Sequence, residues 1–294
     1  MKQIGFIGLG HMGNPMAQRL LKAGLKVKVY DVSKPAVRAL TAMGAVAATS
    51  IADVCHEVDA VITMLQSSAQ VNSVCMGKDG IFSHVPPSIL YIDCSSIELD
   101  ATLALHEEAK VFGVHMLDAP VSGGVSGATA GTLTMMVGGA EKDFLQAKPL
   151  FEKLGKKIIH AGNAGHGQAA KICNNLMLGI SMIAVSEGFN LAEKLGLDLK
   201  KFYEIAANSS GQCWSLTSYC PVPNLMENVP ANNDYKAGFT AAMMLKDLRL
   251  GQHAAESVDA VTPLGAMAME LYSLYVNQGS GEVDFSGIIN MLKS

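Results

Sequence analysis

Three glycines lie close together near the start of the chain, at Gly8, Gly10 and Gly13. They follow a short apolar run, Ile4–Ile7, and precede an amphipathic stretch that continues to about Ala23. In the spacing G-x-G-x-x-G, the first glycine permits a tight turn, the second lets a pyrophosphate approach the backbone, and the third allows close packing of helix on strand. The N–H groups at the start of the helix then bind the anion. The pattern therefore predicts a dinucleotide-binding loop.

An acidic residue, Asp31, closes a second apolar run, Val27–Tyr30, about twenty residues after the glycines. A carboxylate at this place accepts hydrogen bonds from the ribose hydroxyls and repels a 2′-phosphate. We therefore expect NAD rather than NADP as the cofactor. The loop positions expected to contact it are Gly8, Leu9, Gly10, His11, Met12 and Gly13.

Apolar runs of strand length alternate with helical stretches through the first half of the chain. We expect strands at Ile4–Ile7, Val27–Tyr30, Ala60–Leu65, Leu90–Asp93, Val114–Ala119, Thr132–Val137 and Ile158–His160. We expect helices at Met12–Ala23, Val37–Met43 and about Glu141–Leu154, and the stretch Ser50-Ile-Ala-Asp53 has the form of a capping box. This alternation predicts an α/β fold with a mainly parallel sheet covered on both faces.

The second half of the chain has a different pattern. From Gln168 to about Lys194 there is no proline, and apolar residues occur almost all round the helix. Such a helix spans roughly 40 Å, and one that is apolar on most faces is expected to be buried. The rest is mostly helical apart from the irregular stretch Ser209–Ala237. We therefore expect two domains, 1–163 and 164–294, joined by this long helix.

Composition and charge exclude several classes of protein. The net charge of −4 offers no basic surface for nucleic acid. The longest apolar stretch, Leu176–Val185, is about half the length that crosses a bilayer, so no membrane partner is expected. The six cysteines form no CxxC pair and the eight histidines no HxxxH pair, so no metal site is expected. We expect free thiols and a cytoplasmic protein.

Four stretches taken together resemble the β-hydroxyacid dehydrogenase family, and they extend over essentially the whole chain. They are Gly8–Gly13 with Asn14-Pro-Met-Ala17, Asp118-Ala-Pro-Val-Ser122-Gly123-Gly124, Gly165-His-Gly-Gln-Ala-Ala-Lys171 with Asn174-Asn175, and Lys246-Asp247-Leu-Arg249. The resemblance implies a Rossmann-type NAD-binding domain at 1–163 and an all-helical substrate and oligomerisation domain at 164–294. It also implies a homodimer or homotetramer.

The irregular segment resembles the branch of this family that oxidises 3-hydroxyisobutyrate. The matching residues are Ser209-Ser-Gly-Gln-Cys-Trp214-Ser, Tyr219-Cys-Pro-Val-Pro and Asn232-Asn-Asp-Tyr235 through Gly238-Phe239. This likeness implies NAD-dependent interconversion of 3-hydroxy-2-methylpropanoate (3-hydroxyisobutyrate) and methylmalonate semialdehyde. That reaction is a step of valine degradation, within branched-chain amino acid catabolism.

Oxidation of an alcohol by hydride transfer needs one group that cycles a proton near neutral pH. The resemblance places the catalytic lysine at Lys171. A free lysine has a pKa of about 10.4, which desolvation in a cleft would lower to about 7–8. Asn175 lies four residues later on the same helix face, where it would hold the substrate carboxylate or hydroxyl. A structural amide is the alternative for Asn175, and Asn174 is expected to be structural.

The remaining site residues follow from the resemblance. Ser122, Gly123 and Gly124 combine a hydroxyl with adjacent glycine N–H groups, a cradle that suits the substrate carboxylate. Phe239 is expected to wall the substrate pocket, and Asp247 to orient its neighbours. Gln66 stands where the family usually has proline. The further cofactor contacts implied are Leu65, Gln66, Ser96 and Lys246.

Two other functions remain open from the sequence. One is a sister dehydrogenase, acting on another small 3-hydroxy acid, tartronate semialdehyde, glyoxylate, serine or a phosphogluconate. A phosphorylated sugar acid calls for several Arg or Lys, whereas Ser209–Gly238 offers only Lys236. The other is a dinucleotide-binding scaffold without activity, which could dispense with Lys171; this chain retains that lysine together with the glycine loop.

Overall fold

The computed structural model describes residues 1–293 and divides into two compact units. The first unit is Met1–Lys171, and the second begins at Ile172. The boundary predicted between residues 163 and 164 lies slightly earlier in the chain. The contacts divide the chain inside one helix, α9 (His166–Lys194), so the start of this helix belongs to the first unit and the remainder to the second.

The first unit is built on one sheet, which has nine strands within residues 1–293. They are β1 (Gln3–Ile7), β2 (Lys26–Tyr30), β3 (Val46–Ala47), β4 (Ala60–Thr63), β5 (Leu90–Asp93), β6 (His115–Asp118), β7 (Val121–Ser122), β8 (Leu133–Gly138) and β9 (Gly155–Gly162). The order is β3-β2-β1-β4-β5-β6-β8-β7, with β9 paired to β8. The antiparallel pairs among the described strands are β6 with β8 and β7 with β8. Because β9 pairs parallel with β8, these two strands run against the others. The expectation of a mainly parallel, Rossmann-type sheet is confirmed.

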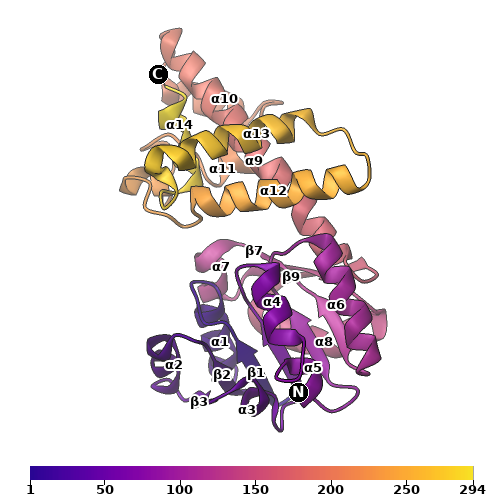
Figure 1. Ribbon diagram of the computed structural model, residues 1–294. Coiled ribbons are helices and arrows are strands. Elements are labelled where there is room, and N and C mark those ends of the chain that lie inside the picture. The colour runs from indigo at the N-terminus through magenta and orange to yellow at the C-terminus, as the bar shows by residue number, and fades with distance from the viewer. Residues whose placement is uncertain (294) are drawn as a thin grey trace. The chain divides into compact units, whose positions relative to one another are not determined.

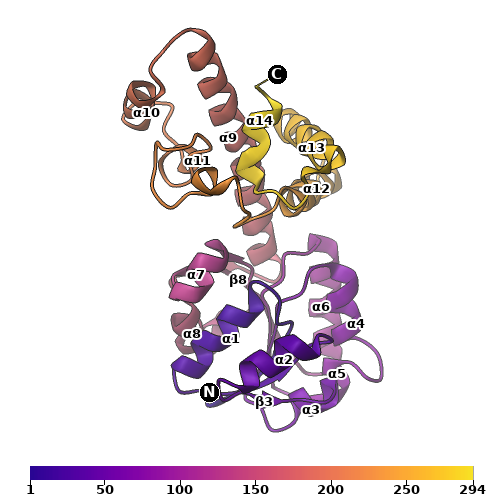
Figure 2. The same ribbon diagram turned by 90° about the vertical axis from the view of Figure 1, so that its left-hand side faces the viewer.

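Helices cover both faces of this sheet. One face carries α1 (Gly13–Lys22), α2 (Lys34–Thr41), α7 (Gly124–Ala130) and α8 (Glu141–Leu154). The other face carries α3 (Ile51–Cys55), α4 (Ser68–Cys75), α5 (Ile81–His84) and α6 (Leu99–Val111). Figure 2 shows α1, α7 and α8 on one side of the unit and α4, α5 and α6 on the other. Alternate strand residues therefore enter different cores: Phe6 and Ile62 enter the first, and Ile7 and Val61 the second.

Five parallel strands end in one row across the sheet. Tyr30 of β2 pairs with Ile7 of β1, and Ile7 pairs with Thr63 of β4. Thr63 pairs with Asp93 of β5, and Asp93 with Asp118 of β6. The segments that follow these residues emerge at the same carboxyl edge, where open α/β sheets bind their ligands.

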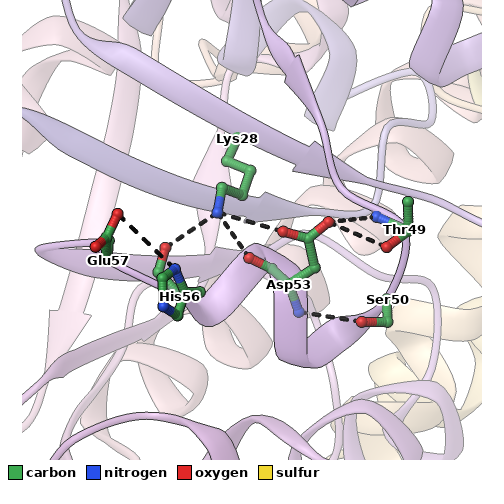
Figure 3. Close-up of polar contacts among 6 residues, drawn as sticks. All are labelled: Lys28, Thr49, Ser50, Asp53, His56 and Glu57. Atoms are coloured by element: carbon green, nitrogen blue, oxygen red, sulfur yellow. Dashed lines mark hydrogen bonds and ion pairs between the residues drawn. The ribbon is translucent and has the colours of Figure 1, made fainter.

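The predicted capping box at the start of α3 forms with one change. Ser50 Oγ accepts the N–H of Asp53 at 3.1 Å, but the Asp53 carboxylate accepts the N–H of Thr49 at 2.8 Å instead of that of Ser50. The hydrogen bond from the Thr49 N–H lowers the pKa of Asp53 from its ordinary value. Lys28 of β2 donates to the carbonyl oxygens of Asp53 and His56, at 2.9 and 3.1 Å (Figure 3). These bonds fix α3 against β2.

The second unit is helical, as expected. Its helices are the remainder of α9, then α10 (Leu199–Ala207), α11 (Trp214–Thr217), α12 (Ala241–Ser257), α13 (Pro263–Tyr275) and α14 (Ile288–Met291), with single turns at Pro230–Asn233, Val276–Ser280 and Phe285–Gly287. Figure 1 shows α12 and α13 side by side. The segment predicted to be irregular, Ser209–Ala237, holds only α11 and the turn at Pro230–Asn233.

Helix α9 differs from the prediction in two respects. It is not buried all round, because Met177 is 71% and Leu191 59% exposed. Of the helices within residues 1–293, α9 alone is long and apolar enough to cross a membrane by length and composition, which the shorter apolar stretch Leu176–Val185 did not indicate. Its residues Met182 and Ile183 are buried in one cluster with α12 and α13, which makes α9 a core helix of the second unit.

Candidate functional site

The glycine loop has the geometry that its spacing predicts. Gly8 has a φ of +93°, a conformation that favours glycine. A Cβ at Gly13 would overlap the carbonyl oxygen of Gly8 and lie 3.2 Å from Phe6, so this position must be glycine for the helix to pack on the strand. Backbone conformation therefore accounts for glycine at the first position, and packing for glycine at the third.

The middle glycine has no such reason within the protein. A Cβ at Gly10 would meet no heavy atom of residues 1–293 within 4 Å, and its φ lies outside the left-handed region. Gly10 is also exposed. The open space over its backbone fits a pyrophosphate, which needs close approach to the main chain.

Asp31 is tied to the same loop. One carboxylate oxygen accepts the N–H of Leu9 at 2.6 Å, and the other accepts the N–H of Ser33 at 2.7 Å. Each carboxylate oxygen has a second lone pair, so both can still accept a ribose hydroxyl. The predicted acid and the predicted glycine loop are thus held in one fixed arrangement.

The loops after β4 and β5 are joined through Ser95, which the sequence did not single out. Its buried hydroxyl accepts the N–H of Leu65 at 2.9 Å and donates to Asp93 at 2.6 Å. The next residue along the β4 loop, Gln66, donates its N–H to Gln70 Oε1 at 3.0 Å. Proline has no N–H, so the residue usual in the family could not make that bond. The predicted contact Ser96, half-buried, follows directly after this junction.

The buried carboxylate of Asp93 holds Ser95, which joins the two loops. Asp93 accepts hydrogen bonds on one oxygen from Thr63 Oγ1 at 2.7 Å and from the Ser95 hydroxyl. Thr63 in turn lies 2.8 Å from the Tyr91 hydroxyl. Burial raises the pKa of Asp93 above its ordinary value, because the charged form loses its hydration.

Lys171 is held against the predicted carboxylate cradle. Its Nζ donates to the carbonyl oxygen of Val121 at 2.9 Å, and the side chain is half-buried. Val121 and Ser122 form β7, and Gly124 begins α7. Gly123 and Gly124 have φ values of +133° and +62°, which turn the chain sharply after the strand. The lysine amine therefore contacts the residue adjacent to Ser122.

The first turn of α9, which leads to Lys171, is fixed by Gln168. This fully buried side chain donates to the carbonyl oxygen of Ser95 at 2.6 Å, and its Oε1 accepts the N–H of Ile97. The helix that carries Lys171 is thus bonded to both sides of Ser96. Gln168 lies in a stretch used for the family resemblance, but only the folded contact over more than seventy positions reveals its role.

In the second unit, Asn175 and Lys246 meet at Asp247. Asn175 is buried and donates its amide to Asp247 Oδ2, while Lys246 Nζ lies 3.7 Å from Asp247 Oδ1. Asn174 is exposed and donates to Asn175 Oδ1 at 2.9 Å. Asp247 is itself 5% exposed. It therefore holds two predicted site residues on different helices, which agrees with the orienting role expected for it.

Phe239 belongs to a separate aromatic stack of the second unit. Its ring packs edge-on against Phe285 with centroids 5.6 Å apart, and its N–H donates to Asp284 Oδ2 at 3.1 Å. Tyr219 stacks between Phe285 and Trp214, and its hydroxyl donates to the same Asp284 oxygen. The predicted wall of the substrate pocket is therefore rigidly supported.

Comparison with known proteins places this arrangement in a family. Residues 3–162 match the family model described as the NAD-binding domain of 6-phosphogluconate dehydrogenase. Residues 165–292 match the one described as the NAD-binding of NADP-dependent 3-hydroxyisobutyrate dehydrogenase. The chain belongs to the β-hydroxyacid dehydrogenase family. It is an oxidoreductase, its cofactor is NAD, and the expectations of both are confirmed.

Three similar β-hydroxyacid dehydrogenases narrow the reaction but not the substrate. NAD-dependent L-serine dehydrogenase of Pseudomonas aeruginosa is 48% identical over 97% of this chain and 96% of its own. The 3-hydroxyisobutyrate dehydrogenase of the same organism is 44% identical over 98% and 97%. The solved structure of Mycobacterium tuberculosis 3-hydroxyisobutyrate dehydrogenase with L-serine is 40% identical over 100% of both chains, with a TM-score of 0.95. These relatives support NAD-dependent oxidation of a hydroxy acid as the reaction of this chain.

Proposed function

We propose that this dehydrogenase oxidises 3-hydroxyisobutyrate to methylmalonate semialdehyde, with Lys171 as the general acid/base. The observation that carries the proposal is the contact of Lys171 Nζ with the Val121 carbonyl, 2.9 Å away and directly before the Ser122–Gly124 loop. It brings the one titratable candidate beside the groups expected to bind a carboxylate. Such a pair suits a substrate with a hydroxyl and a carboxylate close together.

The chemistry divides between cofactor and protein. NAD supplies the hydride acceptor. As the substrate carbon gives up its hydride, its hydroxyl proton passes to the lone pair of the neutral Lys171 amine, and a carbonyl group forms. The hydrogen bond to Val121 occupies one amine hydrogen and so restricts the lone pair to the two remaining tetrahedral directions. In the reverse reaction the protonated amine returns this proton to the carbonyl oxygen.

The substrate carboxylate is assigned to the Ser122–Gly124 loop. The Ser122 hydroxyl and the N–H groups of Gly123 and Gly124 are donors, and positive φ values at both glycines are typical of anion-binding turns. Asn175 is assigned to the substrate hydroxyl or carboxylate, since Asp247 fixes its amide. Phe239 would face the C2 methyl group with its aromatic ring.

The second candidate substrate is L-serine, which carries an ammonium group where 3-hydroxyisobutyrate has a methyl. It is favoured by the 48% identity to an L-serine dehydrogenase. The relative at 44% acts by its name on 3-hydroxyisobutyrate, and both come from one organism, so overall identity does not separate them. The reaction and the lysine's role are the same for both substrates.

We also propose a homodimer or homotetramer in a reducing compartment such as the cytoplasm. Large apolar side chains lie exposed on the second unit, and the most exposed include Met177, Leu195, Val261 and Leu264. Covering such side chains is the usual reason for self-association. Cys173 is a free, exposed thiol, which fits a compartment that keeps thiols reduced.

One assay separates the substrates. Initial rates of NAD reduction are measured with 3-hydroxyisobutyrate, L-serine, glycerate, 3-hydroxypropionate and 6-phosphogluconate. We expect the highest kcat/KM with 3-hydroxyisobutyrate and negligible turnover of 6-phosphogluconate. A higher kcat/KM with L-serine would replace the proposed substrate by the second candidate. No NAD reduction with any of the five would contradict the proposed function.

A further inference from the structure

Asp118 is a charged side chain with no contact to solvent. It ends β6, is 0% exposed, and receives three hydrogen bonds. Its Oδ1 accepts the N–H of Gly165 and lies 2.9 Å from His106 Nε2, and its Oδ2 accepts the N–H of Gln168, each at 2.9 Å. Nothing in the proposed reaction uses this carboxylate, yet a buried charge is costly unless it is fully hydrogen-bonded.

The surrounding backbone is shaped to admit it. A Cβ at Gly138 would lie 2.6 Å from Asp118 Oδ1, and one at Gly167 would lie 2.8 Å from Oδ2. Neither glycine has a positive φ, so backbone conformation does not require them. A Cβ would also lie 2.6 Å from the backbone N of Gly167 at the first position, and 2.5 Å from the carbonyl oxygens of Asp118 and Met136 at the second. Glycine at these two positions therefore lets β6, β8 and the start of α9 pack closely around the carboxylate.

The start of α9 needs an acceptor that its own sequence does not provide. The first N–H groups of a helix have no partner within the helix, and a Ser, Thr, Asp or Asn side chain just before it usually accepts one. Here the residue before His166 is Gly165, which has no side chain. Asp118 takes the place of that cap from a different strand. Its negative charge also matches the positive end of the helix dipole.

The segment from β6 to β7 contacts the start of α9 a second time, at Lys171. Asp118 bonds to Gln168, and three residues later on each segment Val121 bonds to Lys171. The two contacts together fix both the axial position and the rotation of the first helical turns. We propose that Asp118, held by His106, is a positioning residue that sets the place of the Lys171 amine. The proposal rests on the proposed function, in which Lys171 moves the proton.

Substitution of Asp118 by Asn tests this role. The amide nitrogen of Asn cannot accept a hydrogen bond, so the N–H of Gln168 loses its acceptor in one orientation of the amide and the N–H of Gly165 in the other. We expect kcat to fall roughly 100-fold, the size of effect that a displacement of about 1 Å produces at a reacting group. The Kd for NAD, measured by calorimetry, should change less than about threefold, because the glycine loop follows β1, whereas Asp118 ends β6.

The chain contains a control, a second Asp–His pair in the same unit, in which the Asp is buried and the His half-buried. His115 Nδ1 lies 2.6 Å from Asp143 Oδ1, and Asp143 is 5% exposed. Asp143→Asn should lower Tm, though less than Asp118→Asn because one hydrogen bond is affected and not three, and should leave kcat within about twofold of wild type, because the side-chain bond of Asp143 is to His115 and not to α9. Losses of kcat in the two variants that follow their losses of Tm would overturn the proposal and leave Asp118 a purely structural group.

Variants of His106 keep the test decisive if Asp118→Asn does not fold. His106→Gln retains a donor for Asp118 Oδ1 and should keep most of the activity, whereas His106→Leu removes it and should lower kcat at least tenfold. Equal kcat for these two variants, or wild-type kcat in folded Asp118→Asn, would refute the positioning role. Lys171→Ala is assayed in parallel: if it stays active, the proposed function fails on its own account, whatever the Asp118 variants show.

Discussion

Replacement of Gly10 by alanine separates the binding of NAD from the stability of the fold. The added Cβ meets no heavy atom of residues 1–293 within 4 Å, and Gly10 has no positive φ. The melting temperature of Gly10→Ala should therefore stay within about 2 °C of wild type. The methyl group occupies the space assigned to the pyrophosphate, so Kd for NAD should rise at least tenfold, which corresponds to about 1.4 kcal/mol.

Two further glycine variants provide the comparison. At Gly13 the new Cβ overlaps the carbonyl oxygen of Gly8, a backbone atom that cannot move aside. Overpacking of this kind costs about 3 kcal/mol, which lowers the Tm of a unit of this size by about 6–12 °C. Gly188 lies inside α9 with open space around it, so Gly188→Ala should leave NAD binding unchanged and raise Tm slightly.

The assays are thermal unfolding without cofactor and calorimetric titration with NAD. Unchanged NAD affinity in Gly10→Ala would show that the dinucleotide does not pass over this backbone, and the interpretation of the loop would be wrong. A large loss of Tm in the same variant would show that Gly10 serves packing instead.

Three other substitutions test separate parts of the structure. Asp31→Ala should narrow the preference for NAD over NADP, and an unchanged ratio of kcat/KM for the two cofactors would refute the ribose-binding role. Asp53→Asn should lower Tm at pH 7, and this difference from wild type should shrink as the pH falls below about 4. The reason is that a hydrogen bond from Thr49 lowers the pKa of Asp53 from its ordinary 3.8, so the stabilisation is complete above that value and is lost progressively as the pH falls through the lowered pKa; a difference that does not shrink as the pH falls below 3.8 would contradict this. Asp247→Ala leaves the buried Asn175 amide without its acceptor and should cost about 1–3 kcal/mol of unfolding free energy in chemical denaturation; no change would show that water replaces the bond.

Much of the first unit could be predicted from the sequence because its signals are local. Most of the longer strands there contain a short apolar run, and Asp31 follows its strand directly, so strand ends and loop residues were located together. The direction of β8 could not be predicted, since one apolar run reads the same in either orientation. Strand β3, two residues long, is too short to show a pattern.

The parts of the site that the sequence did not predict depend on contacts between distant segments. Asp118 and Gln168 stood in the motifs that carried the resemblance, but their bond joins positions fifty residues apart. The exposure of Met177 could not be predicted for a similar reason: apolar periodicity shows which faces of a helix prefer burial, and only the packed chain shows which of them its own elements cover.

The central claim is that Lys171 gives and takes the proton, and Lys171→Arg tests it most directly. Arginine keeps a positive charge and donors that can reach the Val121 carbonyl, but it does not release a proton at accessible pH. With 3-hydroxyisobutyrate and NAD, kcat should fall at least 1,000-fold in Lys171→Arg and in Lys171→Ala alike, while Kd for NAD stays near that of wild type. Turnover in Lys171→Arg within tenfold of wild type would show that charge alone is sufficient and that another group transfers the proton.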